Sequence, residues 1–288
     1  MSAWVEMAIS GLLLGMLYAL FGLGLSLGFG VMKIINLAHG DFMVLAALMA
    51  TVAGTLGGLN PFVSLLLVVP MMAALGYLTQ RLLLNRVIGS GPLSPLLVTF
   101  GLSIVLQNAM QEIFSADTRS LQAGSITIDA IVIGGVSMGT FPLLIALVSL
   151  TVYILTDLVI QRTGAGRILR ATADDGATAR LMGIRDHRVF ALSMAGVFAL
   201  IGIAGVFYGI RTPFAPSSGP ERLLYAFEAV VIGGLGSIWG TMAGGIVLGL
   251  SQMAGENIHT GYGPLVGHAM FFILLLLRPQ GLLTRAAE

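Results

Sequence analysis

Seven stretches of this chain contain no Asp, Glu, Lys or Arg, and each is long enough to cross a lipid bilayer as a helix. A helix of about 20 residues, rising ~1.5 Å per residue, matches a hydrocarbon core about 30 Å thick. The stretches are Met7–Met32, Phe42–Gln80, Val87–Gln111, Ala130–Thr156, Val189–Ile210, Ala229–Gly255 and Asn257–Leu277. The second is long enough for two crossings, and Asn60 and Pro61, after a pair of glycines, predict a turn in its middle. The sequence therefore predicts about eight hydrophobic elements.

The predicted fold class is an all-α integral membrane protein, a polytopic helix bundle formed by a single transmembrane domain over residues 1–288. Only 9% of the residues are charged and 57% are hydrophobic, whereas a soluble domain carries roughly 25% charged residues. The continuous apolar runs at 65–69 and 273–277 exclude a transmembrane β-barrel, whose strands alternate apolar and polar side chains. The N-terminus has no basic leader, so we expect the first helix to be retained.

The composition also excludes several kinds of site and partner. Without cysteine, the chain has neither a disulfide framework nor a thiolate metal site, and we expect no metal site of any kind. A net charge of +1 gives no reason to expect nucleic acid as a partner.

The basic residues orient the chain, because Lys and Arg favour the cytoplasmic ends of membrane helices. Eleven of the 14 Lys and Arg residues lie in segments predicted on one side. They are Lys33, Arg81, Arg86, the six arginines of residues 161–188, Arg278 and Arg285. The sequence therefore predicts an N-terminus outside and a C-terminus in the cytoplasm.

Closing this topology requires the segment 224–255 to enter and leave from the outside. Gly233, Gly234, Gly236 and Ser237 interrupt the apolar segment and predict a broken, re-entrant helix. An ordinary kinked crossing with one extra span is the open alternative. Glu228 precedes the break, so Glu228 and these four residues are the candidate gate. A small extracytoplasmic β-hairpin-like cap is predicted within 117–139, where isoleucines alternate before a glycine-rich end.

Polar residues also gather after the first long helix. Asn36, His39, Gly40 and Asp41 lie at the edge of two apolar stretches, where an unpaired polar group is costly. Asn36, His39 and Gly40 share a helical face, which favours a hydrogen-bond network at the helix junction. A substrate path or proton relay is the open alternative. Glycines at four-residue spacing, as at 205 and 209 or 245 and 249, indicate close helix packing.

Three segments resemble one transporter family, the permeases of branched-chain amino acid ABC importers, and in particular the H-type membrane subunit of the high-affinity leucine/isoleucine/valine system. Residues 30–42 read Gly-Val-Met-Lys-Ile-Ile-Asn-Leu-Ala-His-Gly-Asp-Phe, residues 166–184 lie in the arginine-rich loop, and residues 230–240 form the glycine-rich segment. The resemblance covers almost the whole chain and implies a type II ABC importer-like permease fold.

In this family, a short helix of the cytoplasmic loop docks into an ATPase subunit. The resemblance therefore implies that residues 161–188 form a coupling loop. A solvated amphipathic loop that contacts only lipid head groups, which the arginines alone would favour, is the open alternative. The residues expected to couple are Ala173, Asp174, Asp175, Ala179, Leu181, Met182, Gly183 and Ile184. The residue types favour one helix over 172–183, with both aspartates at its N-terminus, Gly183 at its end, and Leu181 and Met182 facing outward.

The chain has no P-loop, since Lys33, its one lysine, lacks the glycine context that the motif needs. We therefore expect a transport subunit without an ATPase site, with no cofactor of its own, and with ATP and Mg²⁺ bound by partner subunits. The resemblance implies four kinds of partner: a second permease subunit, two ATP-binding subunits, a periplasmic or lipid-anchored solute-binding protein, and membrane lipid.

The implied location is the bacterial inner (cytoplasmic) membrane, and the implied cargo is branched-chain amino acids or a similar small polar solute. Permeases of this family for urea, short amides or aromatic acids, and a stand-alone ion-driven transporter, are the alternatives.

Overall fold

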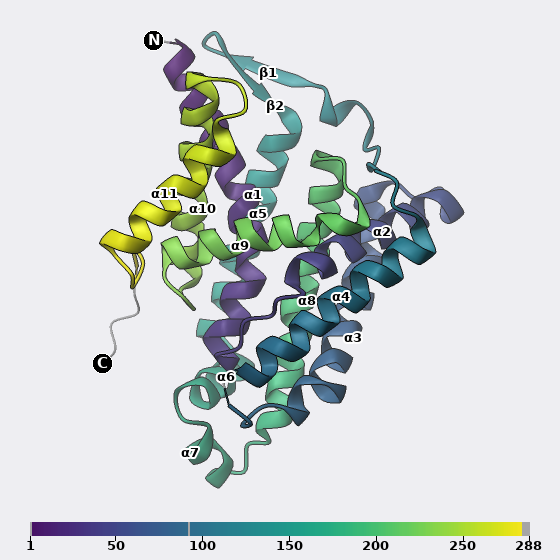
Figure 1. The fold of residues 1–288 in the computed structure, drawn as a ribbon, viewed down its shortest axis with the longest axis vertical. Helices are drawn as coiled ribbons and strands as arrows, with labels where there is room; N and C mark the ends of the chain where they lie inside the picture. The colour runs from purple at the N-terminus through teal and green to yellow at the C-terminus, as the bar shows by residue number, and fades with distance from the viewer. Residues whose placement is uncertain (1, 92, 284–288) are drawn as a thin grey trace. The chain divides into compact units, whose positions relative to one another are not determined.

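The computed structural model describes residues 2–91 and 93–283, and most of them are helical (Figure 1). The helices are α1 Ser2–Met32, α2 His39–Gly57, α3 Pro61–Leu82, α4 Leu93–Phe114, α5 Thr140–Arg162, α6 Gly164–Asp174, α7 Gly176–Leu181, α8 Asp186–Arg211, α9 Gly219–Gly233, α10 Ile238–Ile258 and α11 Gly263–Leu277. Two strands, β1 Ala130–Ile133 and β2 Val136–Gly139, and three short 3₁₀ helices, η1 Leu84–Arg86, η2 Gly124–Thr127 and η3 Pro216–Ser218, complete the described chain.

Six helices of the described chain, α1, α2, α3, α4, α5 and α8, are long and apolar enough to cross a membrane. The bent pair α9 and α10 passes the same test together, and α11 is a shorter apolar helix. These elements account for the eight hydrophobic elements expected. The predicted all-α polytopic membrane fold is therefore confirmed.

The predicted turn between α2 and α3 is present, and side chains at the turn explain it. Gly58 ends α2 with φ 62°, a left-handed conformation that glycine adopts without strain. The Asn60 side chain then accepts a hydrogen bond from the Phe62 amide at 2.9 Å, and Pro61 occupies the first helical position.

The predicted helix break lies between α9 and α10, whose axes differ by 115°. Gly234 and Gly236 adopt φ values of 104° and 81°, which turn the backbone out of the helix. Ser237 then starts α10 by accepting a hydrogen bond from the Gly240 amide at 3.1 Å. The break is confirmed, and its re-entry from the outer side of the membrane stays a prediction.

The predicted hairpin-like segment is a two-stranded antiparallel sheet that runs directly into α5 (Figure 1). Ala130 pairs with Gly139, and Ile133 pairs with Val136 across the turn. The hairpin is confirmed, and its placement outside the cytoplasm stays a prediction.

The chain divides into two compact units, and α1, α5 and α9 each contribute residues to both. The expectation of a single domain therefore stays a prediction. Unit 1 comprises Met1–Ser26, Ala123–Tyr153 and Leu224–Glu288, and unit 2 comprises Leu27–Gln122 and Ile154–Leu223.

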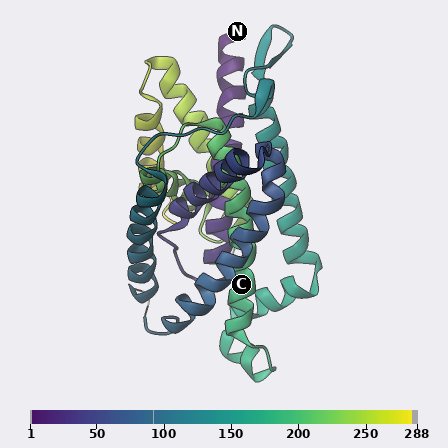
Figure 2. The same cartoon turned by 90° about the vertical axis from the view of Figure 1, so that its right-hand side faces the viewer.

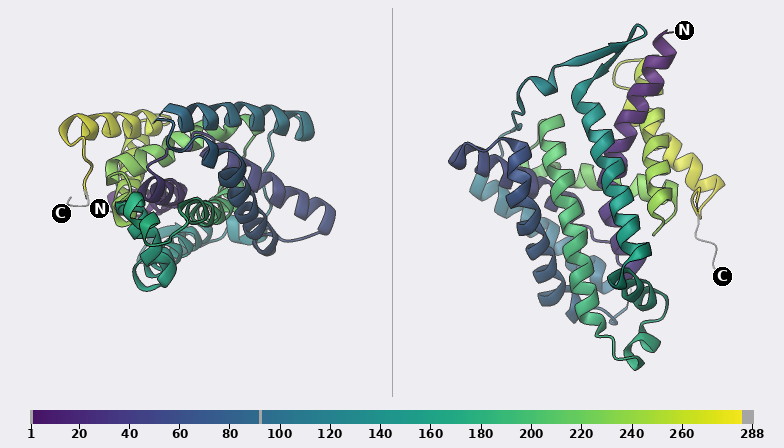
Figure 3. Two further views of the ribbon diagram at one scale, coloured as in Figure 1. Left: turned by 90° about the horizontal axis from the view of Figure 1, so that it is seen from below. Right: turned by 180° about the vertical axis from the view of Figure 1, so that it is seen from behind.

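In unit 1, α1 and α10 lie side by side (Figure 3, right) and approach closely through glycines. A Cβ atom added to Gly245 would lie 2.6 Å from the Ala19 amide nitrogen and 2.7 Å from the Gly15 carbonyl oxygen. The hydroxyl of Tyr153 on α5 donates to the Ala19 carbonyl at 2.8 Å, which joins a third helix to the pair.

In unit 2, α8 packs between α2 and α3, and Figure 2 shows α3 and α8 running side by side. A Cβ atom on Gly205 would overlap the Met43 carbonyl oxygen of α2, and one on Gly76 would crowd the Phe198 ring of α8. The glycine spacing at 205 and 209, like that at 245 and 249, therefore serves helix packing within the chain, as predicted.

Candidate functional site

The predicted coupling loop contains two short helices, α6 and α7, between the ends of α5 and α8 (Figure 2). The Thr163 side chain caps α6 by accepting a hydrogen bond from the Gly166 amide at 3.1 Å. The Arg170 guanidinium of α6 donates to the Ile160 carbonyl of α5. A Cβ atom on Gly166 would overlap the same carbonyl, so α6 packs directly against the end of α5.

The helix α7 is only six residues long but is capped at both ends. One Asp175 carboxylate oxygen accepts from the amides of Ala177 and Thr178 at 3.0 and 3.1 Å, and the other accepts from the Thr178 hydroxyl at 2.5 Å. These bonds, led by the one from the hydroxyl, lower the pKa of Asp175 below its usual value because they favour the ionised form.

At the other end, the Ile184 amide donates to the Ala179 carbonyl at 3.1 Å and the Gly183 amide donates to the Arg180 carbonyl at 3.0 Å. This pair of bonds is a Schellman motif, and it requires the left-handed φ of 83° that Gly183 adopts.

The structure corrects the predicted single helix over 172–183. Asp174 is the last residue of α6, and Asp175 has an extended conformation with φ −148° and ψ 92°. The Asp175 carboxylate binds the next two amides, and an N-capping residue is itself non-helical, so the helix stops and restarts at this position. Ala173 and Asp174 therefore belong to α6, and the other expected coupling residues belong to α7 and its terminal turn.

The C-terminal end of α7 exposes two large apolar side chains, one on its last residue and one on the residue that follows. Leu181 is 87% exposed and Met182 is 79% exposed, whereas Ala179 is 5% exposed and faces inward. Ile184 is half-buried. The structure places Leu181 and Met182 on the outward face, as expected, and their contact with a partner stays a proposal.

The Asn36–Asp41 segment forms the start of α2 and is buried in unit 2. The Asn36 side chain accepts from the Ala38 amide at 3.0 Å, and the Asn36 carbonyl accepts from the His39 amide at 3.2 Å. One carboxylate oxygen of Asp41 accepts from the Ser103 hydroxyl of α4 at 2.5 Å. The Ser103 oxygen also accepts from the Gln107 amide at 3.0 Å.

The same segment contacts the start of α9. A Cβ atom on Gly40 would overlap the carbonyl oxygen of Gly219, the first residue of α9. The hydrogen bond from Ser103 and this close approach join α2 to α4 and to α9. Ser103 is a partner that sequence reasoning missed, because 62 residues separate it from Asp41.

Glu228 meets a partner from α11. Its Oε1 atom lies 2.6 Å from Nδ1 of His268, and the Glu228 side chain is 2% exposed whereas that of His268 is 37% exposed. The Tyr225 ring stacks on both the His268 ring and the Tyr18 ring, with centroids 5.6 and 4.8 Å apart. The Tyr18 hydroxyl donates to Gln252 at 2.6 Å.

We call Tyr18, Tyr225, Glu228, Gln252 and His268 the Glu228 cluster; it connects α1, α9, α10 and α11 within unit 1. The sequence singled out Glu228 but missed His268, which lies 40 residues further along the chain.

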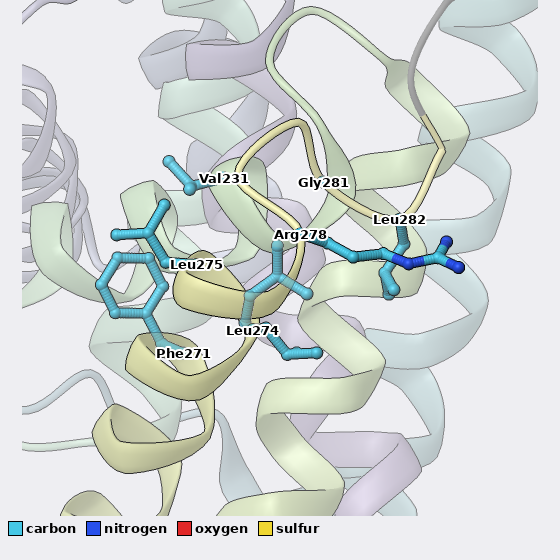
Figure 4. Close-up of a pocket in the computed structure, with 8 residues that line it drawn as sticks. Val231, Phe271, Leu274, Leu275, Arg278, Gly281 and Leu282 are labelled. Atoms are coloured by element: carbon cyan, nitrogen blue, oxygen red, sulfur yellow. The ribbon is translucent and has the colours of Figure 1, made fainter.

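The glycine break is stabilised by the segment that follows α11. The amides of Leu282 and Leu283 donate to the carbonyls of Ile232 and Gly233 at 2.8 and 3.1 Å. Figure 4 shows this segment folded against the end of α9, with the guanidinium of Arg278 pointing away from Val231 and Phe271. The last carbonyls of α9 therefore receive donors that the sequence did not reveal.

Comparison with known proteins decides what kind of molecule carries these features. Residues 7–277 match the family described as the permease component of branched-chain amino acid transport systems. The chain belongs to this family. The matched range contains the start of α2, both loop helices and the glycine break, and it ends at the last residue of α11. The resemblance found in the sequence is confirmed.

Two individual permeases match this chain over nearly their full length, and a third matches over part of its length. The chain is 31% identical to the high-affinity branched-chain amino acid transport system permease protein BraD of Pseudomonas aeruginosa, covering 98% of this chain and 96% of the relative. It is 31% identical to LivH of Escherichia coli K12, with the same coverage. It is 25% identical to LivM of the same organism, covering 94% of this chain and 68% of the relative. The chain thus resembles two permease proteins of one organism, and LivH more closely than LivM.

Proposed function

We propose that this permease is the membrane-spanning subunit of an ABC importer that moves branched-chain amino acids across a bacterial inner membrane. The observation that carries the proposal is the match to BraD and LivH, which covers 98% of the chain. We infer that the chain has no ATPase site and that ATP and Mg²⁺ bind to two separate ATP-binding subunits. A second permease subunit and a solute-binding protein outside the membrane complete the complex.

The loop geometry suggests how ATP hydrolysis drives transport. Leu181 and Met182 supply an apolar contact for the ATPase, because their exposure leaves area that docking removes from water. Caps at both ends make α7 a defined helix instead of a frayed turn. The Arg170 contact with the Ile160 carbonyl then links α6 to a spanning helix, so movement of the loop can reach α5. Alternating access follows as the helices rearrange.

The candidate gate lies around the glycine break. Gly233, Gly234, Gly236 and Ser237 form a junction with a 115° bend, and Glu228 lies one and a half turns before it. A bent junction concentrates φ/ψ freedom at a few residues, which is what a hinge requires. The Asn36–Asp41 segment serves as the helix-junction network that holds α2 against α4.

The N-terminus lies outside and the C-terminus in the cytoplasm in this proposal, because Lys33, Arg81, Arg86 and the arginines of the coupling loop then share the cytoplasmic side. Arg285 supports the same orientation by sequence and lies outside the described residues.

Reconstitution in liposomes tests the proposal. The permease pair, the ATP-binding subunits and the solute-binding protein are assembled in vesicles, and uptake of radiolabelled leucine is measured with and without ATP. We expect uptake that needs ATP and every subunit. Uptake by the permease alone would contradict the importer assignment. Thermal shift of the solute-binding protein with leucine, urea and aromatic acids identifies the cargo separately.

A further inference from the structure

A small polar hollow lies between α3 and α8 in unit 2, and none of its lining residues belongs to α7 or to the Asn36–Asp41 segment. Its volume is about 200 Å³. Tyr77 and Arg81 on α3, Asn85 in η1, and His187, Arg188 and Ala191 on α8 line it. Every lining residue except Ala191 carries a group that can donate a hydrogen bond.

The two arginines of this hollow have no acidic partner. Neither Arg81 nor Arg188 forms an ion pair within residues 2–91 and 93–283. The nearby carboxylate of Asp186 is engaged elsewhere, because it accepts from the His187 amide at 2.8 Å and lies 3.7 Å from Arg180. Two positive charges therefore face a hollow that contains no negative charge.

Two side-chain hydrogen bonds hold Asn85, one of the lining residues, in place. The fully buried Gln80 side chain donates to the Asn85 side chain at 3.0 Å, and Asn85 donates to the His187 carbonyl at 3.3 Å. These bonds tie the end of α3 to the start of α8. The Arg81 guanidinium lies 6.0 Å from the Tyr77 ring centroid, a cation–π contact that orients its side chain.

The hollow lies where spanning helices end. Tyr77 and Arg81 belong to the last turns of α3, and His187 and Arg188 belong to the first turn of α8. Tyr and Arg favour this level because their polar tips reach the head groups of the bilayer. Leu78 and Leu192, each next to a lining residue, are exposed and can contact acyl chains.

We propose that this hollow binds the phosphate group of an anionic phospholipid. Arginine pairs bind phosphate through charge-assisted hydrogen bonds, and the Tyr77 hydroxyl and Asn85 amide supply further polar groups. A volume of about 200 Å³ suits a phosphate group, whereas sites for larger small molecules occupy roughly 300–1,000 Å³. The bound lipid joins α3 to the start of α8, where the coupling loop ends.

Native mass spectrometry of the full chain in detergent tests the proposal. Binding of dioleoyl-phosphatidylglycerol is compared with binding of dioleoyl-phosphatidylcholine, for the natural chain and for the double variant R81Q/R188Q. The matched control is R162Q/R167Q, which removes the same charge from two exposed arginines outside the hollow. A second arm replaces the lipid with inorganic phosphate.

We expect R81Q/R188Q to bind phosphatidylglycerol at least about tenfold more weakly, because two charged hydrogen-bonding groups are lost. The control should bind phosphatidylglycerol as the natural chain does. Inorganic phosphate should show no binding that depends on Arg81 and Arg188. Equal lipid binding by the two double variants would overturn the proposal. Binding of inorganic phosphate that depended on Arg81 and Arg188 in the same way would also overturn it. A third contradicting result is a loss of ATPase co-purification in R81Q/R188Q while lipid binding stays unchanged.

Discussion

Replacing Gly183 with alanine should weaken ATPase docking, because the terminal turn of α7 depends on the left-handed conformation of this residue. Gly183 has φ 83°, and a Cβ atom there would meet nothing within 4 Å, so the substitution changes backbone preference without causing a clash. An L-residue with a side chain pays roughly 1–2 kcal/mol to adopt that conformation. The Schellman bonds from Gly183 and Ile184 are then disfavoured.

The size of the effect follows from the length of α7. A helix of six residues is marginal on its own, so its capped state has little free energy to spare. A cost of 1–2 kcal/mol lowers the ratio of capped to uncapped α7 by a factor of roughly 5–30. We expect co-purification of the ATP-binding subunits and ATP-driven uptake to fall by up to this factor.

A matched control is available in the same helix. Gly176 is also a glycine with no atom within 4 Å of an added Cβ, but its φ is not left-handed. Gly176→Ala should therefore keep docking or improve it, since alanine favours a helix over glycine by about 1 kcal/mol. Gly183→Asn should fall between the two, because asparagine tolerates the left-handed region. Equal docking by Gly183→Ala and Gly176→Ala would refute the reasoning.

Four further perturbations test other parts of the structure. The double variant L181D/M182D should abolish ATPase co-purification without lowering the thermal midpoint, because both side chains are exposed; a lowered midpoint would indicate a packing role instead. Gly245→Leu should destabilise the protein by about 1–3 kcal/mol in detergent melts, since backbone atoms of α1 occupy the space, whereas Gly101→Leu enters open space and should not. Glu228→Ala and His268→Ala should each destabilise the protein by about 1–3 kcal/mol, because each leaves the other side chain without its partner. Strictly additive losses of stability in a double-mutant cycle would argue against the pairing of the two side chains. Because the folded-state pKa of Asp175 is lowered, its carboxylate stabilises α7 at pH values above the ordinary aspartate pKa of about 4, and this contribution is lost as the pH falls through the lower folded-state pKa. Hydrogen exchange of the Ala177 and Thr178 amides should accelerate over that pH range. In the variant Asp175→Asn, exchange of these amides should lose that pH dependence.

The spanning helices could be predicted because lipid imposes a simple requirement on composition and length. A segment such as 140–156, the part of α5 without a charged side chain, must be predominantly apolar whichever neighbours it packs against. The turn and the helix break could also be predicted, since Asn60, Pro61 and Gly234 strongly prefer particular backbone conformations. The restart of the helix at Asp175 was missed because two adjacent aspartates can each cap a helix, and only the backbone shows which one does.

Partners that lie far apart in the chain could not be predicted. Asp41 carries a sequence signal as a charged residue in an apolar setting, but Ser103 is one of many serines and nothing local connects the two. The pairing of Glu228 with His268 depends on how α11 packs against α9, which hydrophobic patterns do not encode. The coupling function came from the resemblance and not from the residues alone, because exposed Leu181 and Met182 suit any apolar partner.

The hydrogen bonds from Leu282 and Leu283 to the end of α9 bear on where the protein can be shortened. A chain cut after Leu277 would retain every apolar helix of the described residues and the whole range shared with the family. It would nevertheless deprive the Ile232 and Gly233 carbonyls of their amide donors, at a cost of about 1–3 kcal/mol for each one left buried. The polar groups at the end of α9 therefore require the chain to continue to Leu283, six residues beyond the end of the last apolar helix, α11.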